Sequence, residues 1–362
     1  MDSRFTREAI LNLLRLGLGK EADLPETLDW GLIHSTAQRL GVSALVFDGY
    51  INLYNSDVAA PDMPSDIKKK WIAEVYGIEK AYLRQWESAK NMASSFTAGG
   101  IKTYVLKGFV LAECYPVPNH RRSVDLDCFL MPISYDNSFD AWEEGNQIME
   151  RAGLKVDRSY YKNSSFRLPG LLVENHRYLT PFRGNRLLRQ TEIYLQSLFH
   201  EDEGLDKIDG TEMYRPPVLA SALFIIEHAY SHFLPEGLTM RHLIDWILFR
   251  QRHSSEIDWT TFDKLLDVFG LRRFYEAFTH VGEFIVGDRS TGDLNSADNL
   301  MLESVWKGMD VPKTLKGVKG KVAIAAHNLK SGWKYRYYST ISLPRAFWNK
   351  IRGFIFLRTP GL

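Results

Sequence analysis

The stretch that decides the fold runs from residue 104 to residue 131, Tyr-Val-Leu-Lys-Gly-Phe-Val-Leu-Ala-Glu-Cys-Tyr-Pro-Val-Pro-Asn-His-Arg-Arg-Ser-Val-Asp-Leu-Asp-Cys-Phe-Leu-Met. It opens with an apolar run that stops at Lys107-Gly108, and it closes with an apolar strand pattern that contains Asp125 and Asp127. Side chains alternate between the faces of a strand, so both carboxylates point the same way. Adjacent carboxylates on a largely buried strand repel each other and are costly to desolvate unless a cation neutralises them. The pattern therefore predicts a metal site.

Length and composition indicate a globular protein. The chain has 362 residues, 45% of them hydrophobic and 25% charged, which predicts two domains or one domain with substantial helical additions. Its two cysteines, Cys114 and Cys128, lie in apolar surroundings, which favours free thiols in a reducing compartment. The N-terminus lacks a signal-peptide pattern, and no apolar run of about 18 residues occurs. We expect a cytoplasmic protein.

The net charge of +1 hides a basic C-terminal tail. Residues 311–362 hold seven Lys, four Arg and no acidic residue, so the first 310 residues carry 34 basic and 44 acidic side chains. Three interpretations stay open: the tail binds RNA through phosphate contacts and stacking, an amphipathic helix at 346–357 lies on an anionic membrane, or the tail lies across the acidic body. The last is favoured because it needs no partner. The aromatic residues of this tail include Trp333, Tyr335, Tyr337, Tyr338, Phe347 and Trp348.

The apolar periodicity predicts a small sheet between two helical regions. We expect helices over 4–55, 65–97, 109–115, 135–152, from about 187, and over 259–270 and 271–286. Strands are expected at 103–107, 124–131, 154–157, 164–168 and 171–179, and a loop at 287–300. This predicts an α/β (α+β) fold with a small mixed sheet. We divide it into an N-terminal helical region (1–100), a catalytic core (101–200), a C-terminal helical region (201–310) and the basic aromatic tail (311–362).

A third carboxylate, Glu174, lies on a later predicted strand, where Glu174 and His176 alternate with apolar and polar neighbours. Transfer chemistry that uses two divalent ions about 3.5–4 Å apart needs bridging carboxylates on a rigid backbone, and neighbouring strands provide such a backbone. Backbone N–H groups at the Gly108 turn would receive phosphate oxygens.

The order Leu106-Lys107-Gly108, Tyr115-Pro116, Arg121 or Arg122, and Asp125-Leu126-Asp127 resembles the uncharacterised nucleotidyltransferase group of the polymerase-beta-like superfamily. The resemblance covers roughly residues 5–290. It implies a nucleotidyltransferase fold, Mg²⁺ or Mn²⁺ as cofactor, an NTP as donor, and Asp125, Asp127 and Glu174 as catalytic metal ligands. Phe109 stands where the wider superfamily has Ser or Gly, so phosphate contacts are expected from backbone N–H groups, Lys107 and an arginine.

The remaining site residues are expected to contact the nucleotide. We assign this role to Lys107, Gly108, Arg122, His176 and His228, with Arg122 favoured over Arg121. The plainer alternatives are a solvated Asp pair at a strand edge, a surface lysine and a loop arginine. His228 and His232 share a helix face, but without a zinc motif they are expected to line a pocket. Asp245, one turn after Arg241, is expected to be a structural ion-pair partner.

These observations predict a metal-dependent nucleotidyltransferase that moves a nucleoside monophosphate from an NTP to an unidentified acceptor and releases pyrophosphate. The alternative is a non-catalytic protein of the same fold that uses its basic tail to hold RNA, a membrane or a protein partner. Nucleotide-dependent stabilisation by Mg²⁺ or Mn²⁺ would favour the enzyme. Nucleic-acid binding that is lost on truncation at residue 310 would favour the binding protein.

Overall fold

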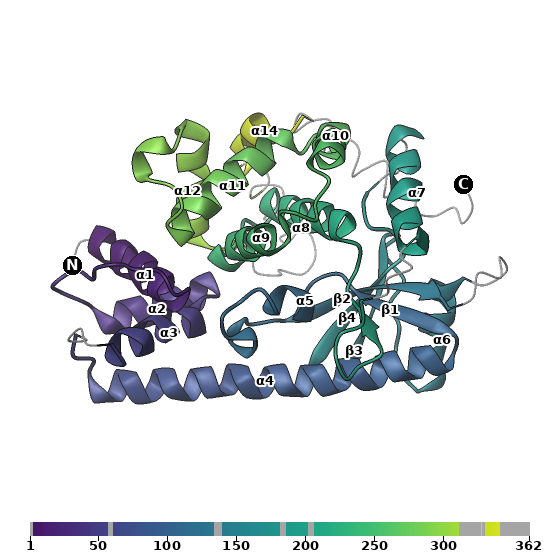
Figure 1. Cartoon of the computed structure of the whole chain (residues 1–362), viewed down its shortest axis with the longest axis horizontal. Coiled ribbons are helices and arrows are strands. Elements are labelled where there is room, and N and C mark those ends of the chain that lie inside the picture. The colour runs from purple at the N-terminus through teal and green to yellow at the C-terminus, as the bar shows by residue number, and fades with distance from the viewer. Residues whose placement is uncertain are drawn as a thin grey trace.

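A mixed β-sheet lies between helices in the computed structural model, which describes residues 3–56, 61–133, 140–181, 186–201, 206–310, 327 and 330–340 (Figure 1). The strands follow the order β3-β4-β2-β1-β5 across the sheet. Strand β2 is central: it pairs antiparallel with β1 and parallel with β4. The predicted α/β architecture is confirmed. The strand bounds are β1 Ile101–Val105, β2 Asp125–Pro132, β3 Asn163–Leu168, β4 Leu171–His176 and β5 Met213–Tyr214.

Helices precede and follow the sheet along the chain. The first group is α1 Ser3–Gly17, α2 Trp30–Leu40, α3 Ser43–Tyr54 and α4 Ser65–Ala98. Helices α5 Phe109–Ala112, α6 Ala141–Arg151 and α7 Arg186–Glu201, with the 3₁₀ turn η1 Pro118–His120, belong to the middle of the chain. The last group is α8 Val218–Phe233, α9 Met240–His253, α10 Trp259–Phe269, α11 Arg272–Val286, η2 Thr291–Asp293, α12 Ser296–Lys307 and α14 Gly332–Tyr338. Among the described helices, none has the length and apolarity needed to cross a membrane.

The two faces of the sheet have different partners. Leu126, Cys128 and Leu130 of β2 face α4 and α6 and share a buried cluster with Met92 and Phe96. On the opposite face, Phe129 packs against Phe199 of α7, with ring centroids 4.8 Å apart. Asp125 and Asp127 have the same parity as Phe129, so they point toward the side covered by α7 and α8 (Figure 1).

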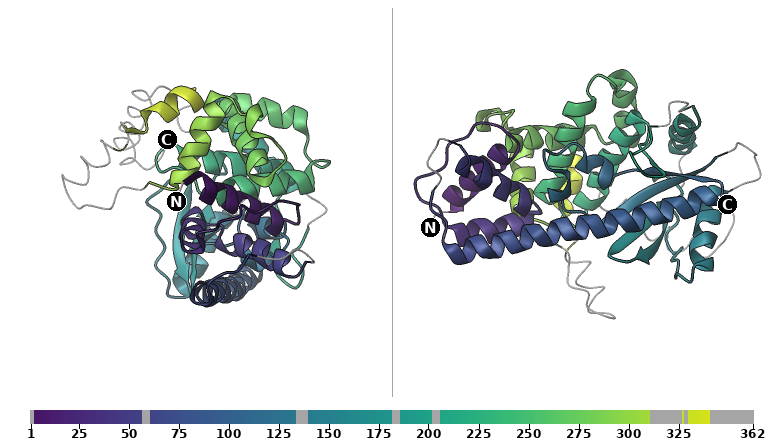
Figure 2. Two further views of the ribbon diagram at one scale, coloured as in Figure 1. Left: turned by 90° about the vertical axis from the view of Figure 1, so that its left-hand side faces the viewer. Right: turned by 60° about the horizontal axis from the view of Figure 1, so that its bottom comes forward.

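Helix α4 joins the N-terminal helices to the sheet, and it is a long, nearly straight rod in Figure 1 and in the right-hand view of Figure 2. Near its start, Trp71 is buried and its indole N–H donates to Ser43 O at 3.0 Å. Toward its end, Ala89, Met92 and Phe96 pack on the sheet. The N-terminal helices are themselves tightly joined, because a Cβ on Gly49 of α3 would lie 1.8 Å from Leu13 O of α1. One helix therefore sets the position of the sheet relative to α1–α3.

Several predicted elements differ from the structure. The predicted loop over 287–300 is wrong because α12 begins at Ser296, where the Asn295 side chain accepts hydrogen bonds from the backbone N–H groups of Ala297 and Asp298. The predicted helix 109–115 ends at Ala112. The predicted strand 154–157 is reduced to one isolated bridge at Asp157, and β5 was not predicted. Helix 135–152 begins at Ala141, and residues 134–139 lie outside the described part.

Part of the predicted tail belongs to the folded body. Tyr338 of α14 is 1% exposed, and its ring lies 5.1 Å from that of Phe233 in α8. The Lys334 ammonium donates to Phe233 O at 2.7 Å. Tyr338 is therefore a core residue and not a platform for stacking bases. The predicted helix at 346–357 lies outside the described residues.

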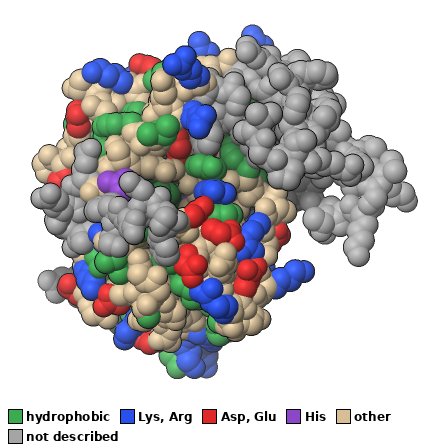
Figure 3. All heavy atoms as spheres, turned by 90° about the vertical axis from the view of Figure 1, so that its right-hand side faces the viewer, with side chains coloured by type: hydrophobic (Ala, Val, Ile, Leu, Met, Phe, Trp, Pro, Cys, Tyr) green, Lys and Arg blue, Asp and Glu red, His purple; other side chains and the backbone are tan. Residues whose placement is uncertain are grey.

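The described surface in Figure 3 carries acidic and basic side chains that are interspersed. On this face the excess of acidic residues in the body does not gather into a patch of one sign. Both cysteines are free: Cys128 is buried and Cys114 half-buried, as the sequence predicts.

Candidate functional site

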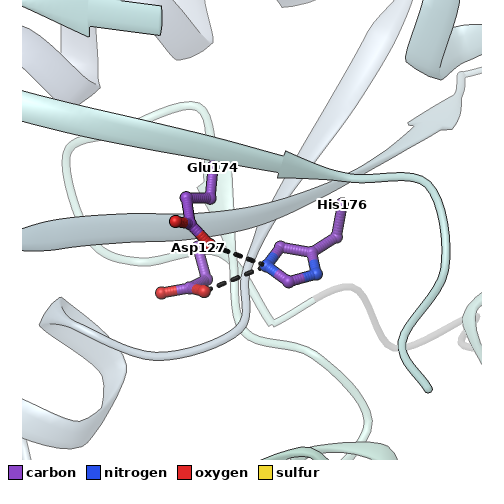
Figure 4. A group of neighbouring side chains, drawn as sticks. All are labelled: Asp127, Glu174 and His176. Atoms are coloured by element: carbon purple, nitrogen blue, oxygen red, sulfur yellow. Dashed lines mark hydrogen bonds and ion pairs between the residues drawn. The ribbon is translucent and has the colours of Figure 1, made fainter. Parts of the chain in front are cut away.

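Three polar side chains meet on neighbouring strands. The parallel pairing of β2 with β4 places Asp127 opposite Glu174, and His176 follows two residues later on the same face. The His176 Nε2 atom lies 2.9 Å from Asp127 Oδ1 and 3.8 Å from Glu174 Oε2 (Figure 4). In the described residues, these three side chains form a group whose potential ligand atoms all lie within 4.8 Å of one another. The parallel pairing of β2 with β4, together with strand alternation, thus brings Asp127, Glu174 and His176 together.

The composition of this cluster differs from the predicted ligand set. His176, predicted as a nucleotide contact, lies beside the carboxylates, whereas Asp125 lies outside the three-residue group. Asp125 and Asp127 instead lie beside the same ammonium group. Lys107 Nζ is 3.5 Å from Asp125 Oδ2 and 2.9 Å from Asp127 Oδ2. Asn163, which sequence reasoning missed, donates its side-chain amide to Glu174 Oε2 at 2.9 Å. Nothing in the local pattern around Asn163 signals this contact.

Lys107 lies two residues after the end of β1, and its ammonium lies beside the carboxylates of Asp125 and Asp127. Besides these contacts, Nζ is 2.7 Å from Nε2 of His228 on α8. An ammonium group can only donate, so this nitrogen of His228 must accept and the ring carries its proton on Nδ1. Both residues were predicted to contact the nucleotide; in this structure they contact each other.

Burial and charge shift the pKa values in this cluster in opposite directions. Burial alone would raise the pKa of the fully buried Asp127, but the Lys107 charge and the His176 hydrogen bond outweigh it and hold the pKa well below its usual range. Burial, followed by the charge of Asp127, raises the pKa of Glu174. Burial and the Lys107 charge lower the pKa of His228 well below its ordinary value. The cluster therefore contains one firmly ionised carboxylate and one that binds a proton more readily.

The donor set fits a divalent ion. Asp127 Oδ2 is buried and accepts no aligned hydrogen bond, although the Lys107 ammonium lies only 2.9 Å away, so the contact is one of charge and not of hydrogen-bond geometry. A buried carboxylate oxygen in this state is suited to a cation. Carboxylate oxygens favour Mg²⁺ and Mn²⁺, and imidazole is compatible with transition metals. For His176 Nε2 to act as a ligand, its proton must be carried on Nδ1.

The turn at Gly108 has a backbone that side-chain-bearing residues rarely adopt. Its φ and ψ angles are 81° and −107°. The following helix, α5, has only four residues, and all of them are buried. The helix at whose start the phosphate contact was predicted is therefore very short. Phe109 packs edge-on against the rings of Tyr82 and Trp86, with centroids 5.3 and 5.0 Å away. Phe109 is therefore a core residue, which explains why no hydroxyl occupies this position.

The two motif arginines have separate positions. Arg121 is 3% exposed and binds Asp245 through two contacts, Nε to Oδ1 at 2.7 Å and Nη2 to Oδ2 at 2.8 Å. Asp245 is an ion-pair partner as predicted, but the pair is with Arg121; the neighbouring Arg241 donates to the backbone oxygen of Arg122. Arg122 itself is exposed and lines a cavity of about 530 Å³ between α4 and residues 121–124.

The aspartate pair on a central strand, the carboxylate on the parallel neighbour and the Lys-Gly turn are the features from which the sequence predicts nucleotidyl transfer. Comparison with protein families agrees: the model described as "Uncharacterised nucleotidyltransferase" matches residues 26–284. The chain belongs to this nucleotidyltransferase family. Comparisons with curated proteins and with solved structures gave no match.

Proposed function

We propose that the chain catalyses metal-dependent transfer of a nucleoside monophosphate from an NTP to an acceptor hydroxyl or phosphate. The observation that carries the proposal is the pairing of Asp127 with Glu174 across parallel strands, with Asp125 two residues away on the same face. Membership of the family supports the transfer of a nucleotide, and the buried Asp127 oxygen without an aligned hydrogen bond supports a divalent ion.

The proposed step forms one bond and breaks another. The acceptor oxygen attacks the α-phosphorus, the bond from this phosphorus to the bridging oxygen breaks, and pyrophosphate leaves. When bound, Mg²⁺ or Mn²⁺ would stabilise the charge on the phosphate oxygens and lower the pKa of the acceptor hydroxyl. Asp125 and Asp127 would hold the ion. Glu174 completes the carboxylate set. It is also the candidate to receive the proton of the acceptor hydroxyl, because its side chain is 30% exposed whereas that of Asp127 is fully buried.

The cavity beside residues 121–124 offers a place for a substrate. Its volume of about 530 Å³ lies in the range of small-molecule sites. One wall is a face of α4 that includes Gly77, Ala81 and Tyr82, and the other includes Arg122 and Val124, which directly precedes Asp125. The cavity lies on the α4 side of the start of β2, whereas Asp125 and Asp127 point to the opposite side of the strand, so a substrate would have to extend around the start of β2 to reach both. The exposed guanidinium of Arg122 suits a phosphate or carboxylate group at the cavity end.

Asp127→Asn is the direct test. It removes the charge of the buried carboxylate while keeping its shape, so nucleotide transfer should fall by about 100-fold or more. The measurement is transfer of label from α-³²P-NTPs with Mn²⁺ into fractions of a cell extract. Asp209→Asn, at an exposed position, is the matched control and should retain transfer. The proposal is wrong if Asp127→Asn transfers label as fast as the wild type, or if the wild type transfers none from any NTP.

A further inference from the structure

The ammonium of Lys107 lies where a cation would be needed to neutralise the aspartate pair. It is 2.9 Å from Asp127 Oδ2 and 3.5 Å from Asp125 Oδ2, and its side chain is only 14% exposed. The Asp127 oxygen that it approaches is the buried one without an aligned hydrogen bond. Lys107 thus supplies the countercharge that a divalent ion would otherwise supply.

An ammonium group and a divalent ion cannot share these oxygens. Metal–oxygen distances of about 2.0–2.6 Å would place a bound ion against the same Asp127 Oδ2 that Lys107 now approaches. Two cations at such a separation repel each other strongly in a site shielded from water. Metal binding therefore requires the Lys107 ammonium to move away from the carboxylates.

The surroundings provide a route for that movement. The lysine side chain has a flexible four-carbon stem, so its ammonium can move without a change in the Gly108 turn. His228 Nε2, at 2.7 Å, is an acceptor on the α8 side, so an ammonium that moves toward α8 would retain this hydrogen-bond partner. A nucleotide phosphate would replace the aspartates as the ion-pair partner of the Lys107 ammonium, because the phosphate brings its negative charge to the site together with the metal.

We propose that Lys107 couples the two ligands: it weakens the binding of a divalent ion alone and is drawn to the phosphates when the NTP binds. This inference rests on the proposed function. In thermodynamic terms, each ligand then raises the affinity for the other by the same factor. The free protein consequently holds little metal, and the complete site forms when metal and nucleotide bind together.

The experiment measures Mn²⁺ affinity by electron paramagnetic resonance at pH 8, with and without an α,β-methylene NTP analogue that cannot be cleaved. In the wild type, the analogue should tighten Mn²⁺ binding by about tenfold or more, within the usual range of coupling between sites. Lys107→Met should bind Mn²⁺ alone at least about tenfold more tightly than the wild type, and the analogue should add much less. Lys155→Met, which removes an exposed lysine, is the matched control.

A second variant separates charge from shape. Lys107→Arg keeps the positive charge and should keep weak binding of Mn²⁺ alone. Thermal unfolding with and without Mn²⁺ checks that the variants fold, and Mn²⁺ should stabilise Lys107→Met more than the wild type. Tight Mn²⁺ binding by the free wild type, or no gain in Lys107→Met, overturns the coupling while leaving the proposed enzyme intact. If the wild type binds neither Mn²⁺ nor the analogue, the proposed function fails as well.

Discussion

Single residues of the Lys107–Gly108 turn have distinct tasks. Lys107 supplies charge to the aspartates, Gly108 supplies a backbone angle, and Phe109 supplies packing. A Cβ on Gly108 would meet its nearest neighbours at 3.7 Å, which is ordinary contact. Space is thus available for a side chain, and the need for glycine comes from the positive φ alone.

Gly108→Ala is expected to destabilise the protein by about 1–3 kcal/mol, because alanine must adopt a sparsely populated backbone conformation. Urea unfolding followed by tryptophan fluorescence measures this change. Gly77→Ala is the matched control: in the interior of α4 its new Cβ meets no atom within 4 Å, so it should stabilise by about 0.5–1 kcal/mol. Equal effects of the two substitutions would contradict the assignment of strain to Gly108.

At the scale of elements, a set of buried hydrogen bonds, here called the clamp, joins the loop at 115–124 (the motif loop) to α9. Arg121 contacts Asp245 through two nitrogen atoms, and its third, Nη1, donates to Gly108 O at 3.2 Å. The Tyr115 hydroxyl donates to Asp245 Oδ1 at 2.7 Å. The Tyr and Arg of the sequence motif thus hold the Gly108 turn in place against a helix that lies far along the chain, and the structure gives them no contact with the carboxylate cluster.

Breaking this clamp from one side should be costly. Arg121→Met leaves Asp245 charged and buried without its partner, and we expect a loss of about 3–5 kcal/mol in unfolding free energy. The double variant Arg121→Met/Asp245→Leu removes both charges and should recover most of that loss. A double-mutant cycle by urea unfolding measures the coupling. A single variant that costs under about 1 kcal/mol would show that the pair is solvated and not a clamp.

The long elements and the shared face of the carboxylates could be predicted from periodicity, because both follow from the local chain. The side chains that each site residue contacts could not be predicted in this way. His176 joins Asp127 only because β4 pairs in parallel with β2, and Arg121 meets Asp245 across 124 positions. Short elements were also missed: β5 has two residues, and the polar start of α12 resembles a loop apart from its capping Asn295.

At the scale of the whole molecule, His120 fastens the N-terminal helices to the motif loop. Its Nδ1 atom lies 2.8 Å from Asp48 Oδ1 of α3, and its Nε2 atom lies 3.1 Å from Glu79 Oε1 of α4. Carboxylates only accept, so both ring nitrogens must carry a proton and the ring is cationic. Burial lowers the pKa of His120, but these two carboxylates outweigh it and place the pKa above its ordinary value of 6.5.

The stability of the whole chain should therefore depend on pH through His120. A histidine whose pKa rises on folding stabilises fully below its unfolded pKa of about 6.5, and this contribution is lost as the pH rises through the folded pKa. The wild type should exceed His120→Gln in stability most at pH 6, and the difference should shrink toward pH 9. Urea unfolding across this range is the measurement. His253→Gln removes a histidine whose ring contacts Glu256 and Phe249, and it is the control for the loss of an imidazole elsewhere in the chain. The same difference from the wild type in both variants at every pH would contradict the special role of His120.

The separation of Arg121 from Asp245 also has a consequence for the order in which the protein is made. At about 5–20 residues per second, a ribosome needs roughly 6–25 s to add the 124 positions between them. Until then, the guanidinium has no buried partner and β1 lacks β5, which is synthesised more than 100 positions later. Until β5 and α9 have been synthesised, the nascent chain thus presents an incomplete sheet and a Gly108 turn without its contacts to α9.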